Sequence, residues 1–171
     1  MNTRTALPQL GDNILVVVEN APRFLDELRV VTASLLSLPT LPTPFFTLMA
    51  CCPPRYWEHG GADNPDDRQE IEAAWKEEQA DTLRAEHYLE QAKTVLEGLG
   101  VPAAHINTLI AVDDDDLLAA TMHELTQTRL HYSGVIVSEQ HDDIVNRLLK
   151  RGLTDIFRHV PHVEVLTLHL D

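Results

Sequence analysis

Acidic and polar side chains recur where the predicted strands of this chain end. Glu19 follows one apolar run, four aspartates occupy 113–116 after another, and 138–143 reads Ser-Glu-Gln-His-Asp-Asp after a third. Carboxylates in such places bind divalent cations or cap helices, and they repel phosphate groups. The candidate functional segments are therefore 19–21, 52–54, 113–116 and 138–141.

Five apolar runs of strand length position these segments: Ile14–Val18, Phe45–Cys52, Ile106–Val112, Val135–Ser138 and Val163–Leu170. The first run is almost entirely β-branched, which is typical of a strand buried on both faces in a parallel sheet. Because helical segments separate the runs, we predict a doubly wound α/β fold. It is a Rossmann-like, three-layer α/β/α arrangement around a five-stranded parallel sheet. Ligands bind such a sheet beyond the carboxyl ends of its strands, near the point where strand order reverses.

The helices are predicted from apolar spacing and from their caps. Residues 24–36 carry an amphipathic stripe that ends before a proline-rich linker. Asn64 and Pro65 form a strong helix start, and one long helix, or two helices broken near 79–82, should follow. Aspartates at 113–116 and 142–143 are expected to cap two further helices.

The last predicted strand resembles an edge strand. Leu166, Leu168 and Leu170 alternate with less apolar residues, whereas the first run, Ile14–Val18, is continuously apolar. An apolar edge needs a cover or a partner strand.

Length and composition suit one domain, 13–171, with a loose tail at 1–12 and a helical insertion at about 55–82. The 171 residues are 44% hydrophobic, and 27 acidic against 13 basic residues give a net charge of −14. This charge argues against nucleic acid or an anionic membrane as a partner. No apolar run approaches the roughly 20 residues of a membrane span. The start of the sequence has no signal-peptide stretch, so we expect a cytoplasmic protein.

Other reactive patterns have simpler explanations. Pro161 breaks the helix that would align His159 and His162 on a metal ion, so we predict a polar turn and no metal site there. Cys51 and Cys52 end an apolar strand and are expected to be buried. Cys52 becomes a redox-sensitive thiol only if a ligand crevice reaches it. The sequence has no nucleophile elbow, and we predict no catalytic residue.

Two parts of the chain resemble the universal stress protein family. The opening strand ends in Glu19 and Asn20, and Gly134–Ser138 is followed by a polar loop, a short helix, 152–161 and a final strand. The resemblance covers roughly 13–170 and implies a fold of the adenine nucleotide alpha hydrolase type. The segment at about 55–82 is then an insertion that a minimal member lacks.

The glycine loop of the family's nucleotide-binding members is missing. That loop has the form G-x2-G-x9-G-[S/T] after the fourth strand, and its glycines let backbone N–H groups close on phosphate oxygens. An ungapped alignment places Ser138, His141 and Arg151 at the three glycine positions, with Gly152 one residue late. The loop at 138–143 instead carries acidic residues. A carboxylate about 5 Å from a phosphate would oppose binding of the phosphate by roughly 3 kcal/mol at an effective dielectric near 20. We therefore predict that ATP is not bound by the usual loop.

One family feature does align. The acid that contacts adenosine after the first strand matches Glu19, whose carboxylate is able to accept hydrogen bonds from a ribose or base, or to cap the next helix. If ATP with Mg²⁺ binds, the resemblance implies a site at Glu19, Asn20, Val112, Asp113, Ser138, His141 and Gly152.

Two functions remain open. The first is a non-enzymatic regulatory or binding module of the stress response, without a cofactor. The resemblance implies a homodimer through the last strand, with an interface at Val163, Val165, Leu166, Leu168 and Leu170. The acidic insertion is a possible surface for a protein partner, since 58–97 holds 12 acidic and 4 basic residues. The second function is an adenine-nucleotide switch with at most slow hydrolysis, and a divalent-cation site at the acidic blocks is a weaker third.

Overall fold

All five predicted strands are present. The structure is a computed structural model that describes residues 10–38, 42–52, 65–112, 120–121, 123–125, 131–138 and 163–170. Its elements are β1 (Asn13–Val17), α1 (Phe24–Leu36), β2 (Phe45–Cys52), α2 (Pro65–Gly98), the 3-10 helix η1 (Ala103–His105), β3 (Ile106–Val112), β4 (Gly134–Ser138) and β5 (Glu164–Leu168). The predicted bounds of β2 and β3 agree with the structure, and those of the other strands differ by one or two residues.

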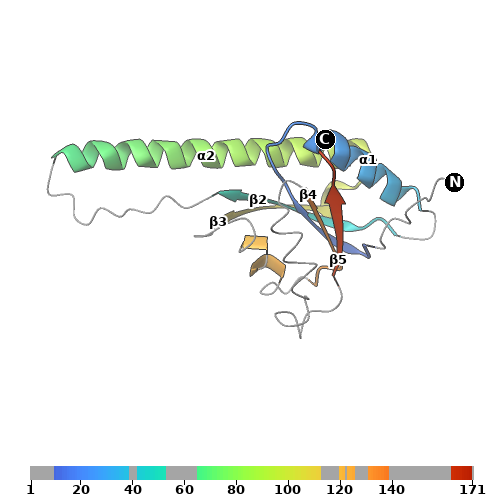
Figure 1. The fold of residues 1–171 in the computed structure, drawn as a ribbon. Coiled ribbons are helices and arrows are strands. Elements are labelled where there is room, and N and C mark those ends of the chain that lie inside the picture. The colour runs from blue at the N-terminus through green and yellow to red at the C-terminus, as the bar shows by residue number, and fades with distance from the viewer. Residues whose placement is uncertain are drawn as a thin grey trace.

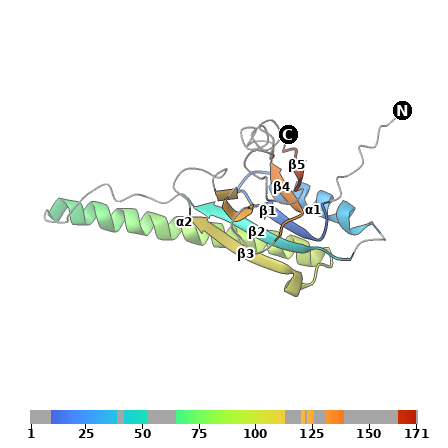
Figure 2. The ribbon, with the colours of Figure 1, turned by 90° about the horizontal axis from the view of Figure 1, so that it is seen from below.

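The five strands form one parallel sheet in the order β3-β2-β1-β4-β5. β1 lies at the centre, with Phe46 of β2 and Gly134 of β4 on either side of Ile14. Strand order reverses between β1 and β4, as the view in Figure 2 shows. The prediction of a doubly wound parallel sheet is confirmed.

Each face of the sheet has its own apolar core. On one face, α1 and α2 pack against alternate residues of β1 and β2, including Val16 and Leu48. On the other face, Leu15 and Met49 pack with Leu125, which belongs to the helical residues 120–121 and 123–125. Figure 1 shows α1 and α2 above the sheet and this short helical segment below it. β1 and β4 are therefore buried on both faces, as the apolar run of β1 predicts.

α2 is one unbroken helix of 34 residues. At 1.5 Å per residue it is about 50 Å long, whereas eight strand residues span about 26 Å. The helix therefore projects beyond the sheet (Figure 1). Its C-terminal part is buried through residues such as Leu89 and Leu96, whereas Trp75 and Leu83, which lie earlier in the helix, are 54% and 65% exposed.

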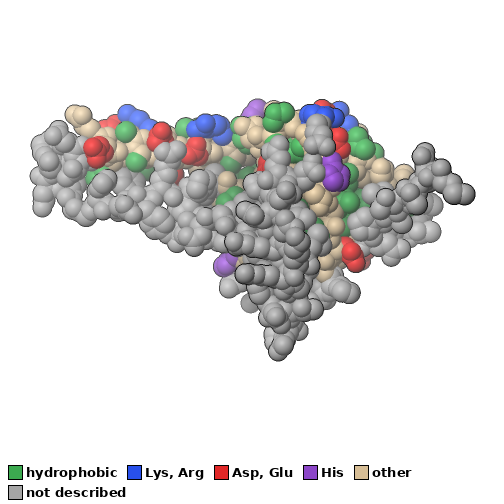
Figure 3. Space-filling model, in the orientation of Figure 1, with side chains coloured by type: hydrophobic (Ala, Val, Ile, Leu, Met, Phe, Trp, Pro, Cys, Tyr) green, Lys and Arg blue, Asp and Glu red, His purple; other side chains and the backbone are tan. Residues whose placement is uncertain are grey.

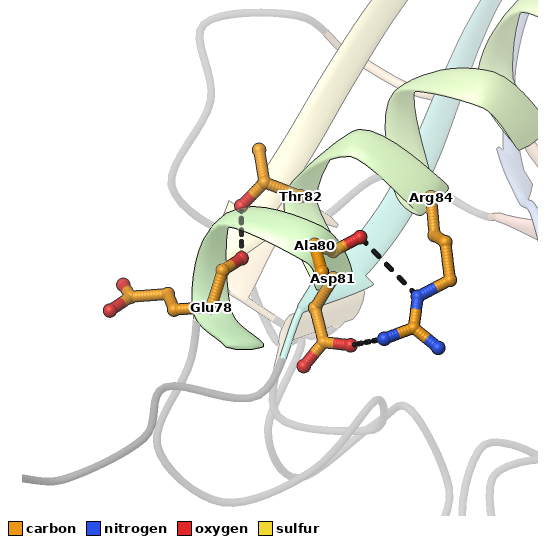
Figure 4. A network of polar contacts seen from close by, with 5 residues as sticks. All are labelled: Glu78, Ala80, Asp81, Thr82 and Arg84. Atoms are coloured by element: carbon orange, nitrogen blue, oxygen red, sulfur yellow. Dashed lines mark hydrogen bonds and ion pairs between the residues drawn. The ribbon is translucent and has the colours of Figure 1, made fainter. Parts of the chain in front are cut away.

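Side-chain hydrogen bonds stabilise α2 near 79–82, where the sequence allowed a break. The Thr82 hydroxyl donates to the carbonyl of Glu78 at 3.0 Å, and the Arg84 guanidinium contacts Asp81 at 2.6 Å and the carbonyl of Ala80 at 3.3 Å (Figure 4). Acidic and basic side chains alternate along the exposed surface of this helix (Figure 3). The helical insertion after the second strand is confirmed, and it forms one helix instead of two.

The packed part of the chain begins earlier than predicted. Leu10, assigned to a loose tail, is only 2% exposed and lies in the core beside α1 and α2. The Ser133 hydroxyl donates to the Leu10 carbonyl at 2.7 Å. The prediction of a loose tail is therefore wrong for residues 10–12, because a buried leucine and a hydrogen bond fix the chain before β1. The predicted helix at 142–151 and the predicted turn at 159–162 lie outside the described residues.

Candidate functional site

Glu19 and Ser138 meet where the strand order reverses. β1 and β4 are adjacent and parallel, with Val16 beside Ile136, so both strands carry their following residues to the same edge. The Ser138 hydroxyl donates to Oε2 of Glu19 at 2.9 Å. Ser138 is fully buried and Glu19 is half-buried. The structure therefore brings together two residues predicted for the site from positions 119 apart in the sequence.

This hydrogen bond changes what the carboxylate offers to a ligand. A hydrogen bond to a charged group stabilises a protein by about 1.5–3 kcal/mol, roughly twice the value for a neutral pair. A ligand that used Oε2 of Glu19 would have to compete with the Ser138 hydroxyl or share the oxygen with it. Neither interpretation of Glu19 from the sequence, as a ribose acceptor or as a helix cap, included this partner.

The remaining residues of the predicted nucleotide site are not all beside this pair. Asn20 is exposed and directly follows Glu19. Val112 ends β3, which β2 separates from β1, so it lies two strands away along the same edge of the sheet. Asp113, His141 and Gly152 lie outside the described residues.

The residues predicted for a dimer interface lie on and beside β5, which is an outermost strand as predicted. Leu168 and Leu170 are 1% and 9% exposed and belong to the core that contains α1 and α2. Val163 is 9% exposed and packs on the opposite face. Val165 and Leu166 are half-buried. Three of the five side chains are therefore already packed within the protomer, and a partner would meet the outer edge of β5.

Thiols and potential metal ligands form no metal site in the described part of the chain. Cys51 is half-buried near the end of β2, which ends at Cys52. Within the described ranges, no three His, Cys, Asp or Glu side chains are placed to hold a metal ion. The acidic block at 113–116 lies outside those ranges.

A polar cluster beneath the sheet was missed by the sequence analysis. Tyr132 is 2% exposed, and its hydroxyl donates to Oε1 of Glu124 at 2.8 Å. Burial raises the pKa of Tyr132 well above its ordinary value, the Glu124 carboxylate raises this pKa further, and a hydrogen bond with the Thr47 side chain opposes the shift. The cluster ties the helical residues 123–125 to β2 and to the residue two positions before β4. Its sequence signal is a tyrosine just before an apolar strand and a carboxylate eight residues earlier.

A second feature missed by the sequence analysis is a groove between α2 and β3. It has a volume of about 390 Å³ and is lined by Glu86, Leu89, Glu90, Thr108, Leu109 and Ile110. The sequence indicated only the last strand as an edge. The position of β3 at the other edge depends on strand order, which the apolar runs do not specify.

No helix in the described part of the chain combines the length and the apolar character needed to cross a membrane.

Comparison with known proteins supports the fold. No protein-family model and no curated protein sequence matches the chain. The structure is similar to the crystal structure of a protein from the universal stress protein family from Burkholderia pseudomallei, with a TM-score of 0.54 and 12% sequence identity. The match covers 94% of this chain and 98% of that chain. The chain therefore has the fold of a universal stress protein family member, as the resemblance of its sequence implied.

Proposed function

We propose that this chain is a non-enzymatic regulatory or binding module of the universal stress protein type. It acts in a stress response by docking to other proteins, as a homodimer, and it does not bind ATP through a glycine loop. The fold is compatible with many functions, so the proposal rests on the residues at the point of strand reversal.

The hydrogen bond between Ser138 and Glu19 is the observation that carries the proposal. Ser138 stands where the nucleotide-binding pattern has its first glycine, and its side chain is fully buried. Glu19 stands where the pattern has the acid that contacts adenosine, and its Oε2 accepts a hydrogen bond from the Ser138 hydroxyl. A buried hydroxyl thus stands where the pattern has a close backbone approach to phosphate, and it already binds an oxygen of the acid that would contact adenosine. Both features disfavour nucleotide binding by the usual route.

The edge position of β5 supports the proposed homodimer. Val165 and Leu166 are half-buried, and Glu164 and His169 are exposed, so this edge combines apolar and polar side chains. Pairing with a second copy would satisfy the backbone groups of an edge strand. The exposed first half of α2 is a candidate surface for a protein partner, since Trp75 lies among charged residues there.

An adenine-nucleotide switch with at most slow hydrolysis is the alternative. The location of Glu19 favours it, because the carboxyl ends of strands at a reversal point are where doubly wound sheets bind ligands. The exposed Asn20 adds an amide to the same edge.

Thermal melting with and without Mg-ATP separates the two functions. A nucleotide present at 100 times its dissociation constant would add about 2.7 kcal/mol to the free energy of unfolding. The proposal predicts no change in melting temperature and no adenine absorbance in the purified protein. A shift that Glu19→Gln removes would favour the nucleotide switch, and Glu97→Gln on the exposed surface of α2 is the matched control.

A further inference from the structure

The groove between α2 and β3 has the features of a binding site for an extended peptide. We propose that it binds a basic, extended segment of another protein, which adds to the outer edge of β3 as a sixth strand. This inference goes beyond the proposed homodimer, because β3 and β5 lie at opposite edges of the sheet.

The edge of β3 is suited to strand addition. β3 is an outermost strand of seven residues, which span about 23 Å. Its sequence, Ile-Asn-Thr-Leu-Ile-Ala-Val, contains none of the charged residues, prolines or glycines that usually protect an edge. Asn107 and Thr108 are exposed, and Leu109 and Ile110 are half-buried. Edge strands of this kind take up an extended peptide through main-chain hydrogen bonds.

The helical wall of the groove determines which side chains the peptide needs. Glu86 and Glu90 are exposed and lie one turn apart on α2, and the buried Leu89 contributes apolar surface. The two glutamates are separated by about 6 Å along the helix axis, close to the roughly 6.7 Å between alternate residues of a strand. Alternate lysines or arginines of a bound strand would reach both carboxylates and lay their apolar stems over Leu89 and Ile110.

Charge argues against a second copy of the chain in this groove. Each copy has a net charge of −14, and pairing through β3 would bring the glutamates of two α2 helices toward each other. A basic partner instead gains electrostatic attraction on approach and in the complex.

The test measures binding of a fluorescein-labelled peptide of alternating lysine and valine by fluorescence anisotropy at low and high salt. An alternating glutamate and valine peptide is the charge control. Two further lysine and valine peptides carry N-methyl groups on alternate backbone nitrogens, one peptide for each of the two possible phases. The methyl groups remove backbone hydrogen bonds but keep the charge. The protein variants are the double substitution Glu86→Lys with Glu90→Lys and its matched control, Glu70→Lys with Glu97→Lys. All four glutamates are exposed on α2, and circular dichroism melting confirms that both variants fold.

The proposal predicts that the lysine peptide binds in a salt-dependent manner and that the glutamate peptide does not. The groove variant should weaken binding at least about tenfold, and the control variant should weaken it by less than about threefold. One phase of N-methylation should abolish binding and the other should not, because one side of the peptide faces β3.

Three results would overturn the proposal. They are no binding of the lysine peptide, equal binding of both N-methylated forms, and equal losses in the two variants. An altered sedimentation mass of the groove variant without peptide binding would show that a second copy occupies the groove. Peptide binding should persist in a β5 variant such as Val165→Lys, so failure of the homodimer and failure of this inference are distinguishable.

Discussion

Ser138 donates a hydrogen bond of 2.9 Å to Glu19 across the point where strand order reverses, although the two residues are 119 positions apart. The parallel register of β1 and β4 makes the contact possible, because both strands end at the same edge. In a doubly wound sheet this edge is the usual position of a ligand. In this protein, the hydroxyl of one strand end and the carboxylate of the next bind each other there.

Removing the Ser138 hydroxyl should destabilise the protein. Ser138→Ala leaves a half-buried carboxylate without a hydrogen bond from a buried donor, so the free energy of unfolding should fall by about 1.5–3 kcal/mol. Urea unfolding measures this change. Ser37→Ala is the control, since the exposed Ser37 hydroxyl also donates a hydrogen bond, to the carbonyl of Ser34 at 2.7 Å, and its loss should cost less than about 1 kcal/mol. Equal effects of the two substitutions would contradict a special role for the Ser138 bond.

Gly134 should tolerate no side chain. A Cβ atom there would lie 2.8 Å from both the Cβ and the carbonyl oxygen of Leu10, so Gly134→Ala should lower the free energy of unfolding by about 1–3 kcal/mol. Gly98→Ala is the matched control, because a Cβ atom at the end of α2 would meet nothing within 4 Å and alanine favours the helix. Thermal melting should show a lower midpoint for the first variant and an unchanged or higher one for the second. The reverse order would show that Leu10 does not pack against β4.

The raised pKa of Tyr132 predicts a specific loss of stability in alkaline solution. Burial keeps the folded phenol neutral above pH 10.0, whereas the unfolded phenol ionises near that pH. The stabilisation is therefore complete below pH 10 and falls above it by about 1.4 kcal/mol per pH unit.

Comparison with Tyr132→Phe isolates this group from the other titrating residues. The variant should be about 1–2 kcal/mol less stable than the natural sequence at pH 7, because it lacks the hydrogen bond to Glu124. The difference should shrink above pH 10. Parallel pH profiles of the two proteins in denaturant unfolding would contradict the assignment.

The proposed homodimer predicts that a charge on β5 separates the two copies. Val165→Lys places a lysine at a half-buried position of the edge strand, and two such lysines would oppose each other across the interface. Sedimentation velocity should show a dimer for the natural sequence and a monomer for the variant. Asn107→Lys, on the exposed edge of β3, should remain a dimer. A monomeric natural protein, or a dimeric Val165→Lys variant, would exclude the β5 interface. Leu168 is unsuitable for this test because it is 1% exposed in the protomer core.

The strands could be predicted from the sequence because their burial is local information. The run from Ile14 to Val18 is apolar at every position, and only a strand covered on both faces buries all of them. The alternation along β5 likewise indicated an edge strand, and the sheet order confirms it. The helix at 24–36 was predicted from its amphipathic stripe for the same reason.

Contacts between distant segments could not be predicted in the same way. The bond from Ser138 to Glu19, the packing of Leu10 and the groove beside β3 all depend on which strands are neighbours and in what register. Apolar periodicity shows that a strand is buried but does not show what lies next to it. The continuity of α2 was left open because Gln79–Thr82 is a polar interval, and the hydrogen bonds of Thr82 and Arg84 that hold this stretch become visible only in the structure.

Equilibrium dialysis of the purified protein against ATP with Mg²⁺ tests the central claim most directly. Because the Ser138 hydroxyl and the Glu19 carboxylate are bonded to each other at the strand ends, the proposal predicts equal nucleotide concentrations on both sides of the membrane. Retention of one nucleotide per chain, lost on substitution Glu19→Ala, would contradict it and establish a nucleotide site at the edge between β1 and β4.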